Sequence, residues 1–232
     1  MKLVLSILRL SILLLASLPV MASDQLADVL VYSVHEAGGE AVVSRLLITP
    51  TMLRIDQGKQ DDDYILYDKR AETIYSVTPD EQSILVIHPD RAKRQIPGDM
   101  KLSIEQLSDV NAPNVGGSKP EHWRMTVNGE ICQEAILAPG LMSRSLVLYG
   151  DYLTLLANQH FVSLDAIPVE YRAPCEDAVH VFVPTVFLDK GLPIRKWDKG
   201  GNQERLVEFS SNQSVSADYF VLPADYQQVP SR

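Results

Sequence analysis

The spacing of hydrophobic and polar positions follows two different patterns along the chain. After residue 28, short apolar runs recur about every ten residues and are separated by turn residues, which is typical of antiparallel strands. The predicted strands in this part are Val29–His35, Ala41–Ile48, Thr51–Asp56, Tyr64–Tyr67, Thr73–Val77 and Ile84–Ile87. The pattern predicts an antiparallel meander rather than strands that alternate with helices.

Side chains alternate between the two faces of a strand, so the sequence also predicts which faces are covered. In Thr51–Asp56, Leu53 and Ile55 share one face, while Arg54 and Asp56 share the other. We therefore expect this part of the sheet to have one apolar and one polar side. Ser83–Ile87 is apolar at both kinds of position, which predicts a strand covered on both faces.

The strongest local signal is a predicted hairpin. Asn128-Gly129 separates the strand patterns Trp123–Val127 and Glu130–Leu137. A two-residue type I′ turn requires positive φ at both central positions, and Asn-Gly is the pair that best tolerates this.

The spacing of apolar residues changes in the middle of the chain. In Leu141–Phe161, apolar residues recur at a spacing of three to four, which predicts a helix pair or one helix enclosed by sheet. Strand patterns then return at Val179–Leu188, Ile194–Trp197, Leu206–Ser210 and Ala217–Leu222. Strands, a helical middle and further strands predict a single α+β domain over residues 23–232.

The first 22 residues have the pattern of a cleaved export signal. Lys2 and Arg9 form a basic start, Leu10–Leu15 is a short apolar run, and small residues lead to an expected cleavage after Ala22. An uncleaved anchor is the other interpretation, but the run is shorter than the roughly 20 apolar residues of a membrane span. We expect an exported, periplasmic protein that is soluble after cleavage.

Charge narrows the class of partner. The formal net charge of the whole chain is −9, and loss of Lys2 and Arg9 with the signal would change it to −11. Phosphate backbones require clustered Lys and Arg, so we expect no nucleic-acid partner. We also expect no stable membrane insertion.

Cys132 and Cys175 are the two cysteines of the chain. Exported chains favour a disulfide between such a pair, and closing a loop of about 43 residues would stabilise by roughly 4 kcal/mol on the loop-entropy estimate. A catalytic or metal-binding thiol is the other interpretation, but the pair lacks C-x-x-C spacing and a histidine at ligand spacing.

The chain carries few signals of catalysis or metal binding. The five histidines are widely spaced, and none forms a pair with the spacing of a metal site; they are His35, His88, His122, His160 and His180. No catalytic motif is present that joins a nucleophile to a base. We therefore expect no cofactor, no metal and no enzymatic activity.

Several short segments carry a resemblance to a known family. Near the start they are Thr49–Asp56, Tyr64–Asp68 and Thr73–Val77; near the end they are Lys190–Ile194 and Phe220–Tyr226. Together they resemble the LolA/LolB-like superfamily, and most closely the uncharacterised exported LolA-like proteins of Gram-negative bacteria.

The resemblance implies a curved, incomplete antiparallel β-barrel with helices covering the open side. Members of the superfamily hold acyl chains of lipoproteins or other lipids there, and each buried CH₂ contributes about 0.8 kcal/mol. The implied cavity-lining residues are Leu53, Ile55, Ile65, Ile74, Ile84 and Val86 on the sheet and Leu148, Leu155 and Leu156 on the helix. The same residues could instead pack against each other and leave no cavity.

These features favour a soluble periplasmic protein that binds a lipid, a lipoprotein acyl chain or another apolar ligand. The rival expectation is a non-enzymatic structural or regulatory interaction module of the cell envelope, with a protein partner.

Overall fold

The computed structural model describes residues 24–59, 62–89, 94–108, 111–164, 166–168 and 171–231, so the predicted signal at 1–22 lies outside the described residues. The strands are β1 (Asp24–His35), β2 (Val42–Ile48), β3 (Met52–Asp56), β4 (Tyr64–Asp68), β5 (Thr73–Thr78), β6 (Ser83–Ile87), β7 (Leu102–Leu107), β8 (Glu121–Val127), β9 (Glu130–Ala138), β10 (Leu192–Asp198), β11 (Gln203–Ser216) and β12 (Gln227–Pro230). The helical elements are α1 (Ser143–Leu164), α2 (Pro174–Asp177), the 3₁₀ turns η1 (Pro79–Glu81) and η4 (Ala217–Phe220), and the π-helical turn η3 (Ala178–Phe182).

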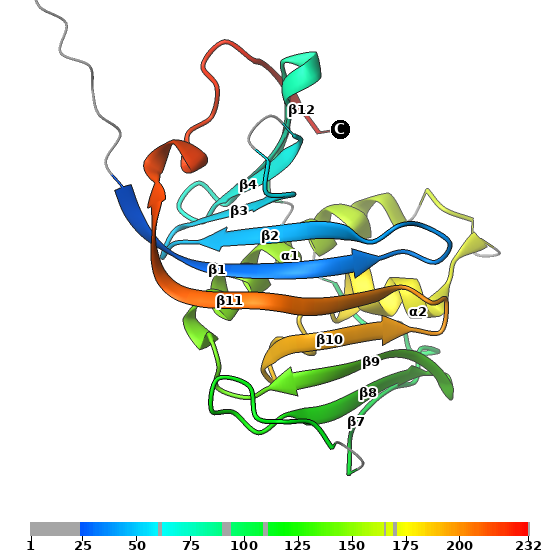
Figure 1. Ribbon diagram of the computed structural model, residues 1–232. Coiled ribbons are helices and arrows are strands. Elements are labelled where there is room, and N and C mark those ends of the chain that lie inside the picture. The colour runs from blue at the N-terminus through cyan, green and yellow to red at the C-terminus, as the bar shows by residue number, and fades with distance from the viewer. Residues whose placement is uncertain are drawn as a thin grey trace, which may run out of the picture.

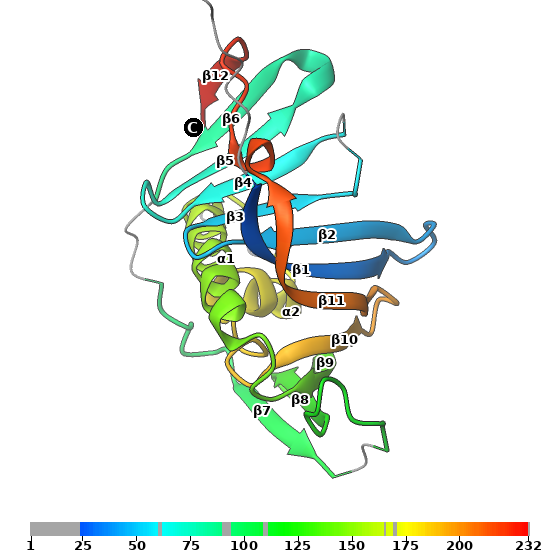
Figure 2. The same ribbon diagram turned by 60° about the vertical axis from the view of Figure 1, so that its left-hand side comes forward.

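The described strands form one open sheet in the order β12-β6-β5-β4-β3-β2-β1-β11-β10-β9-β8-β7. Strands β2 to β6 form the predicted meander, and only the β12–β6 pair among the described strands is parallel. The sheet curves around α1 and α2, which lie on the same side of it (Figures 1 and 2). We call this side the inner face and the opposite side the outer face. The α+β class with an open, curved sheet is thus confirmed.

The meander half of the sheet, β2 to β6, is packed on both faces. On the inner face, residues such as Leu53 and Ile74 form one buried cluster with Leu148 and Leu155 of α1. On the outer face, a second cluster forms beneath Phe220 of η4 and the residues that follow it. This double cover explains why these strands are apolar on both sides.

The other half of the sheet, β7 to β11, has a different cover. Met125, Ala135 and Leu137 of β8 and β9 pack on the inner face against Ala178 and Phe187. The disulfide between Cys132 and Cys175 ties this covering segment to β9, with the two Cα atoms 5.1 Å apart, which confirms the predicted pairing.

One predicted backbone feature is confirmed, and a second feature is seen only in the structure. Asn128 and Gly129 have φ values of 54° and 83°, as the hairpin turn requires. Gly191, within the Lys190–Ile194 segment, lies so close to β9 that an added Cβ would be 2.7 Å from the carbonyl of Ala138. Only glycine therefore fits where the chain enters β10.

The single helix α1 confirms the helical prediction, but two predicted strands are wrong. Val179–Leu188 consists of η3 followed by turns, and Ala217–Leu222 begins with η4. In the first case the apolar residues pack as a short irregular cover on β8 and β9. In the second, the Ser216 hydroxyl accepts a hydrogen bond from the Asp218 amide and starts a 3₁₀ turn. Strands β7 and β12 have no predicted counterpart.

Candidate functional site

A partly open, mostly apolar pocket lies between α1, the segment 179–188 and the sheet at β9 and β10. Its volume is about 210 Å³. Drug-sized ligand pockets span roughly 300–1,000 Å³. The pocket is therefore smaller than a typical drug-sized pocket, and its volume suits a small apolar ligand or a single acyl chain.

One stripe of α1 forms the first wall of the pocket. The stripe consists of Tyr149, Leu153, Leu156 and His160. Their spacing of four, three and four residues puts them on one face of the helix. This stripe lies beside the one that carries Leu148 and Leu155, so α1 uses neighbouring faces for the filled core and for the pocket.

The second wall comes from the segment that was predicted to be a strand. Val179, Val183, Val186 and Phe187 present apolar side chains to the pocket. The wall is continuous with α2, whose Cys175 is bonded to β9. A short irregular segment held by a covalent tether thus closes one side of the pocket.

Polar groups gather at one part of the lining. His160 and His180 both line the pocket, together with Gln133 and Lys196. Burial, with a smaller contribution from His180, lowers the pKa of His160 below its usual value of 6.5. The Lys196 ammonium is 2.6 Å from the Glu204 carboxylate, and Glu176 lies 3.2 Å from His180.

The structure separates the predicted lining residues into three groups. Leu53, Ile55, Ile65, Ile74, Leu148 and Leu155 belong to the filled inner cluster or pack against it. Ile84 and Val86 belong to the outer cluster, so their placement opposite the helix is wrong. Leu156 packs at the edge of the inner cluster and also lines the pocket.

The strand register explains the position of Ile84 and Val86. Ile74, on the inner face, lies opposite Ile87, whereas Val77 lies opposite Ile84 and Tyr75 opposite Val86. Directly opposed residues share a face, and neighbouring residues in a strand do not. Ile87 is therefore the β6 residue that packs against the inner cluster.

Polar contacts join α1 to β1 and to the meander half of the sheet. The Ser145 hydroxyl donates a hydrogen bond to Asp28 of β1, whose other oxygen accepts from the Asn212 amide. Lys69, just after β4, pairs with Asp151 at 2.7 Å. These contacts hold the first turns of the helix on the filled core.

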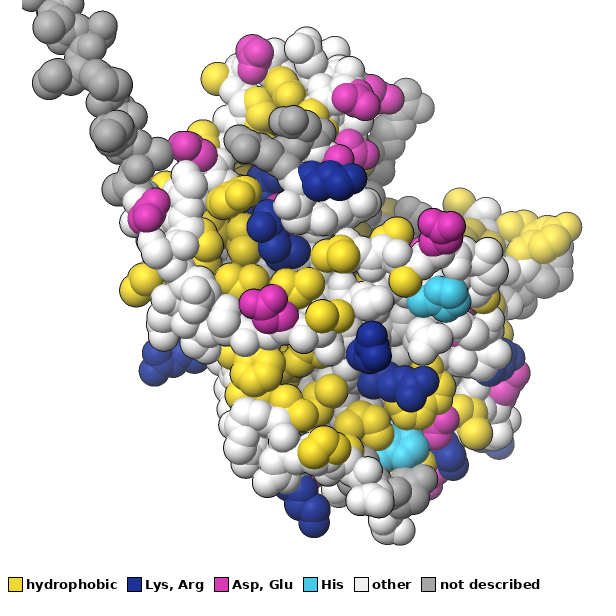
Figure 3. Space-filling model, viewed as in Figure 1, with side chains coloured by type: hydrophobic (Ala, Val, Ile, Leu, Met, Phe, Trp, Pro, Cys, Tyr) yellow, Lys and Arg dark blue, Asp and Glu magenta, His cyan; other side chains and the backbone are white. Residues whose placement is uncertain are grey.

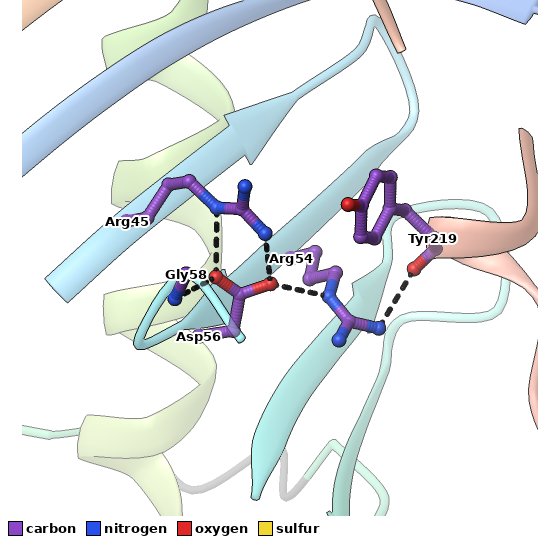
Figure 4. A network of polar contacts seen from close by, with 5 residues as sticks. All are labelled: Arg45, Arg54, Asp56, Gly58 and Tyr219. Atoms are coloured by element: carbon purple, nitrogen blue, oxygen red, sulfur yellow. Dashed lines mark hydrogen bonds and ion pairs between the residues drawn. The ribbon is translucent and has the colours of Figure 1, made fainter. Parts of the chain in front are cut away.

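A buried ionic network lies on the outer face, on the side of β3 that was predicted to be polar (Figure 4). Asp56 accepts hydrogen bonds from Arg45 at 2.8 and 2.9 Å, from Arg54 at 2.7 Å and from the Gly58 amide at 2.9 Å. Arg54 and Asp56 are each only 3% exposed, so the expectation of a polar, solvated side at these positions is wrong.

Arg54 also binds the segment that covers it. Its guanidinium lies 3.6 Å from the centre of the Tyr64 ring and donates to the Tyr219 carbonyl at 3.1 Å. Burial would raise the pKa of Asp56, but the hydrogen bonds from Arg45, Arg54 and Gly58 outweigh it and lower that pKa. The network therefore anchors η4 to β3, and its partners are about 165 residues apart in sequence.

Two observations concern metals and membranes. Among the residues that the structure describes, no group of three or more His, Cys, Asp or Glu side chains could hold a metal ion. No helix within these described ranges is long and apolar enough to span a bilayer.

Comparison with known proteins gives only distant overlaps. No protein-family model and no curated protein sequence matches the chain. Among solved structures, an uncharacterized conserved protein from Thermus thermophilus overlaps with a TM-score of 0.42 at 11% identity, over 91% of this chain and 92% of that one.

Two crystal structures of PNGF-II, in the C2 and P21 space groups, overlap with TM-scores of 0.39 and 0.40 at 6% identity. They cover 89% of this chain, which spans about a third of the PNGF-II chain. At these scores the overlaps assign neither a family nor a function to this chain.

Proposed function

We propose that this is an exported, periplasmic protein of LolA/LolB-like type that holds a small apolar ligand or a single lipid acyl chain, without catalysing a reaction. The observation that carries the proposal is the 210 Å³ pocket between α1 and the segment 179–188. The resemblance of the strand and tail segments, the open curved sheet and the disulfide support the LolA-like and exported parts of the proposal.

The pocket chemistry suits a ligand that is apolar along its length and polar at one end. Aliphatic and aromatic side chains from α1 and from 179–188 would remove the ligand chain from water. Gln133, His180 and Lys196 would meet its polar end. A fatty acid or the acyl part of a lipid has this form.

The first test is recovery and displacement of a ligand. Native mass spectrometry of gently purified protein is expected to show a bound lipid, and a fluorescent fatty acid is expected to bind and to be displaced by unlabelled fatty acid. Absence of both a co-purified lipid and a displaceable probe would contradict the proposal.

A pocket-filling variant locates the binding. Leu156→Trp adds volume inside the pocket and is expected to weaken probe binding at least tenfold. Val162→Trp is the matched control, because Val162 lies on the same helix and is 47% exposed. Equal binding by both variants would place the ligand elsewhere.

Ligand length provides a second test of this site. Each buried CH₂ contributes about 0.8 kcal/mol, which corresponds to a roughly fourfold gain in affinity. Fatty acids of increasing length should follow this gain until the pocket is full, after which affinity levels off. A series with no dependence on length would exclude burial of the chain.

A further inference from the structure

A second candidate site lies on the outer face, away from the pocket. A surface hollow of about 400 Å³ is lined by Ser33, His35, Ala41, Arg195, Gln203 and Arg205. We call these residues the arginine patch. In Figure 3, which shows the outer face, Lys and Arg side chains adjoin one another over β10 and β11.

The strand register assembles the patch in two rows. Arg205 of β11 lies directly opposite Ser33 of β1 on one side and Arg195 of β10 on the other. The next row joins His35, Gln203 and Trp197 in the same way. Directly opposed residues share a face, with Cβ atoms about 4.5–5.5 Å apart. The register thus directs two guanidinium groups to one place.

Two like charges in directly opposed positions destabilise a sheet. An anion bound between them would remove this repulsion. Elsewhere on this face, arginines are paired with acids: Arg45 with Asp56, and Arg124 with Glu134 and Glu105. Among the residues that the structure describes, the side chain of Arg205 makes no hydrogen bond or ion pair, although its backbone belongs to the sheet between β1 and β10. Its neighbour Glu204 lies on the inner face, where it pairs with Lys196. Glu208, opposite Val31, lies on the outer face but forms no ion pair with Arg205.

The remaining lining groups are able to donate hydrogen bonds. Arg195 lies 5.0 Å from the centre of the Trp197 ring and donates to the Gln203 side-chain oxygen at 3.4 Å, which leaves the amide nitrogen of Gln203 as a donor. Ser33 contributes a hydroxyl group and His35 an imidazole. The chain has a net charge of −9. The hollow has the opposite character, because two cations and several hydrogen-bond donors line it.

We propose that the arginine patch binds a phosphate group. A guanidinium offers a planar fork of N–H donors that matches phosphate oxygens, and two such forks match the double charge of a phosphate monoester. A single carboxylate would be satisfied by one of the two arginines. The group belongs either to free phosphate or to the headgroup of a lipid.

Trp197 provides a direct readout, because a ligand that engages Arg195 changes the contact between Arg195 and the indole ring. Trp123 is the other tryptophan, so Trp123→Phe isolates the Trp197 signal. Titration with inorganic phosphate at constant ionic strength is expected to give a saturable fluorescence change in this background.

Variants of equal charge separate the site from the net charge. Arg205→Gln is expected to weaken phosphate binding at least tenfold, whereas Arg144→Gln, at an exposed position on α1, is expected to change it less than twofold. In phosphate-free buffer, Arg205→Gln should leave the Tm unchanged or raise it, because it removes a repulsion. Equal phosphate affinity in the two variants, or no saturable response, would overturn the proposal.

Vesicles identify the source of the phosphate group. Co-sedimentation of the protein with vesicles that contain phosphatidic acid, whose headgroup is a phosphate monoester, would support a lipid headgroup if it is lost in Arg205→Gln. Saturable phosphate binding without co-sedimentation would support a free or small-molecule phosphate.

Discussion

The two halves of the sheet are covered in different ways. Over β2 to β6, α1 lies on the inner face and the segment from η4 onward lies on the outer face, and both contacts are filled with large buried side chains. Over β9 and β10, the inner cover is the end of α1 and the segment 179–188, and a 210 Å³ space remains.

The difference shows where this fold leaves space between the sheet and its cover. Over the filled half, large side chains of α1 and of the strands interdigitate at the close packing that is usual in protein interiors. A short irregular segment held by one disulfide presents fewer side chains and leaves a gap. The position of the pocket therefore follows from the irregular cover rather than from the helix alone.

The largest effect is expected from the buried network of the filled half. Asp56→Ala leaves Arg54 buried without its carboxylate and should lower the free energy of unfolding by about 3–5 kcal/mol. Guanidinium chloride unfolding measures this. Asp62→Ala, which removes a more exposed carboxylate 3.7 Å from Lys59, is the control and should cost less than about 1 kcal/mol. Similar costs for both would contradict a buried network.

Truncation of core leucines compares the two halves directly. Leu53→Ala, at a fully buried position, should cost about 2–5 kcal/mol. Leu156→Ala should cost at least about 1 kcal/mol less, since Leu156 is partly buried and already adjoins empty space. If thermal or denaturant unfolding gives Leu156→Ala the larger cost, the space beside it is not a pocket.

Removal of the disulfide should affect one half selectively. The double variant Cys132→Ala/Cys175→Ala should lose about 2–4 kcal/mol of stability. Amide hydrogen exchange should rise most in the segment 174–188, while β3 to β5 keep their protection at matched stability. Uniform loss of protection across both halves would show that the tether does not act locally.

A smaller effect is expected from pH. The pKa of His160 is lowered in the folded state, so the unfolded chain binds this proton more readily. The free energy of unfolding should therefore fall as the pH drops through 6.5. The decrease should be small, because the His160 side chain is partly exposed to solvent. The comparison is with His160→Gln, which should lack this component between about pH 7.5 and 5. Identical pH profiles would contradict the assignment.

The sequence predicts the regular elements well because their signals are local. The spacing of apolar residues locates β2 to β6 and α1, and Asn128-Gly129 locates the β8–β9 hairpin. The two cysteines, in a chain that is expected to be exported, also predict the disulfide that the structure contains.

The remaining features depend on contacts distant in sequence. Val179–Leu188 has the composition of a strand, and its packing on β8 and β9 decides otherwise. Arg54 and Asp56 alternate with apolar residues as on a solvated face, but Tyr219, far along the chain, covers them. The pocket was beyond prediction for the same reason, since one of its walls is the segment expected to be a strand.

The central claim is that an apolar ligand enters the pocket and not the filled core. Amide hydrogen exchange with and without dodecanoate tests it most directly, because it reports each half of the sheet in one experiment. We predict that the ligand increases protection in residues 149–160 and 179–188 and leaves β3 to β5 unchanged. Protection gained across β3 to β5, or no change in either half, would contradict the account.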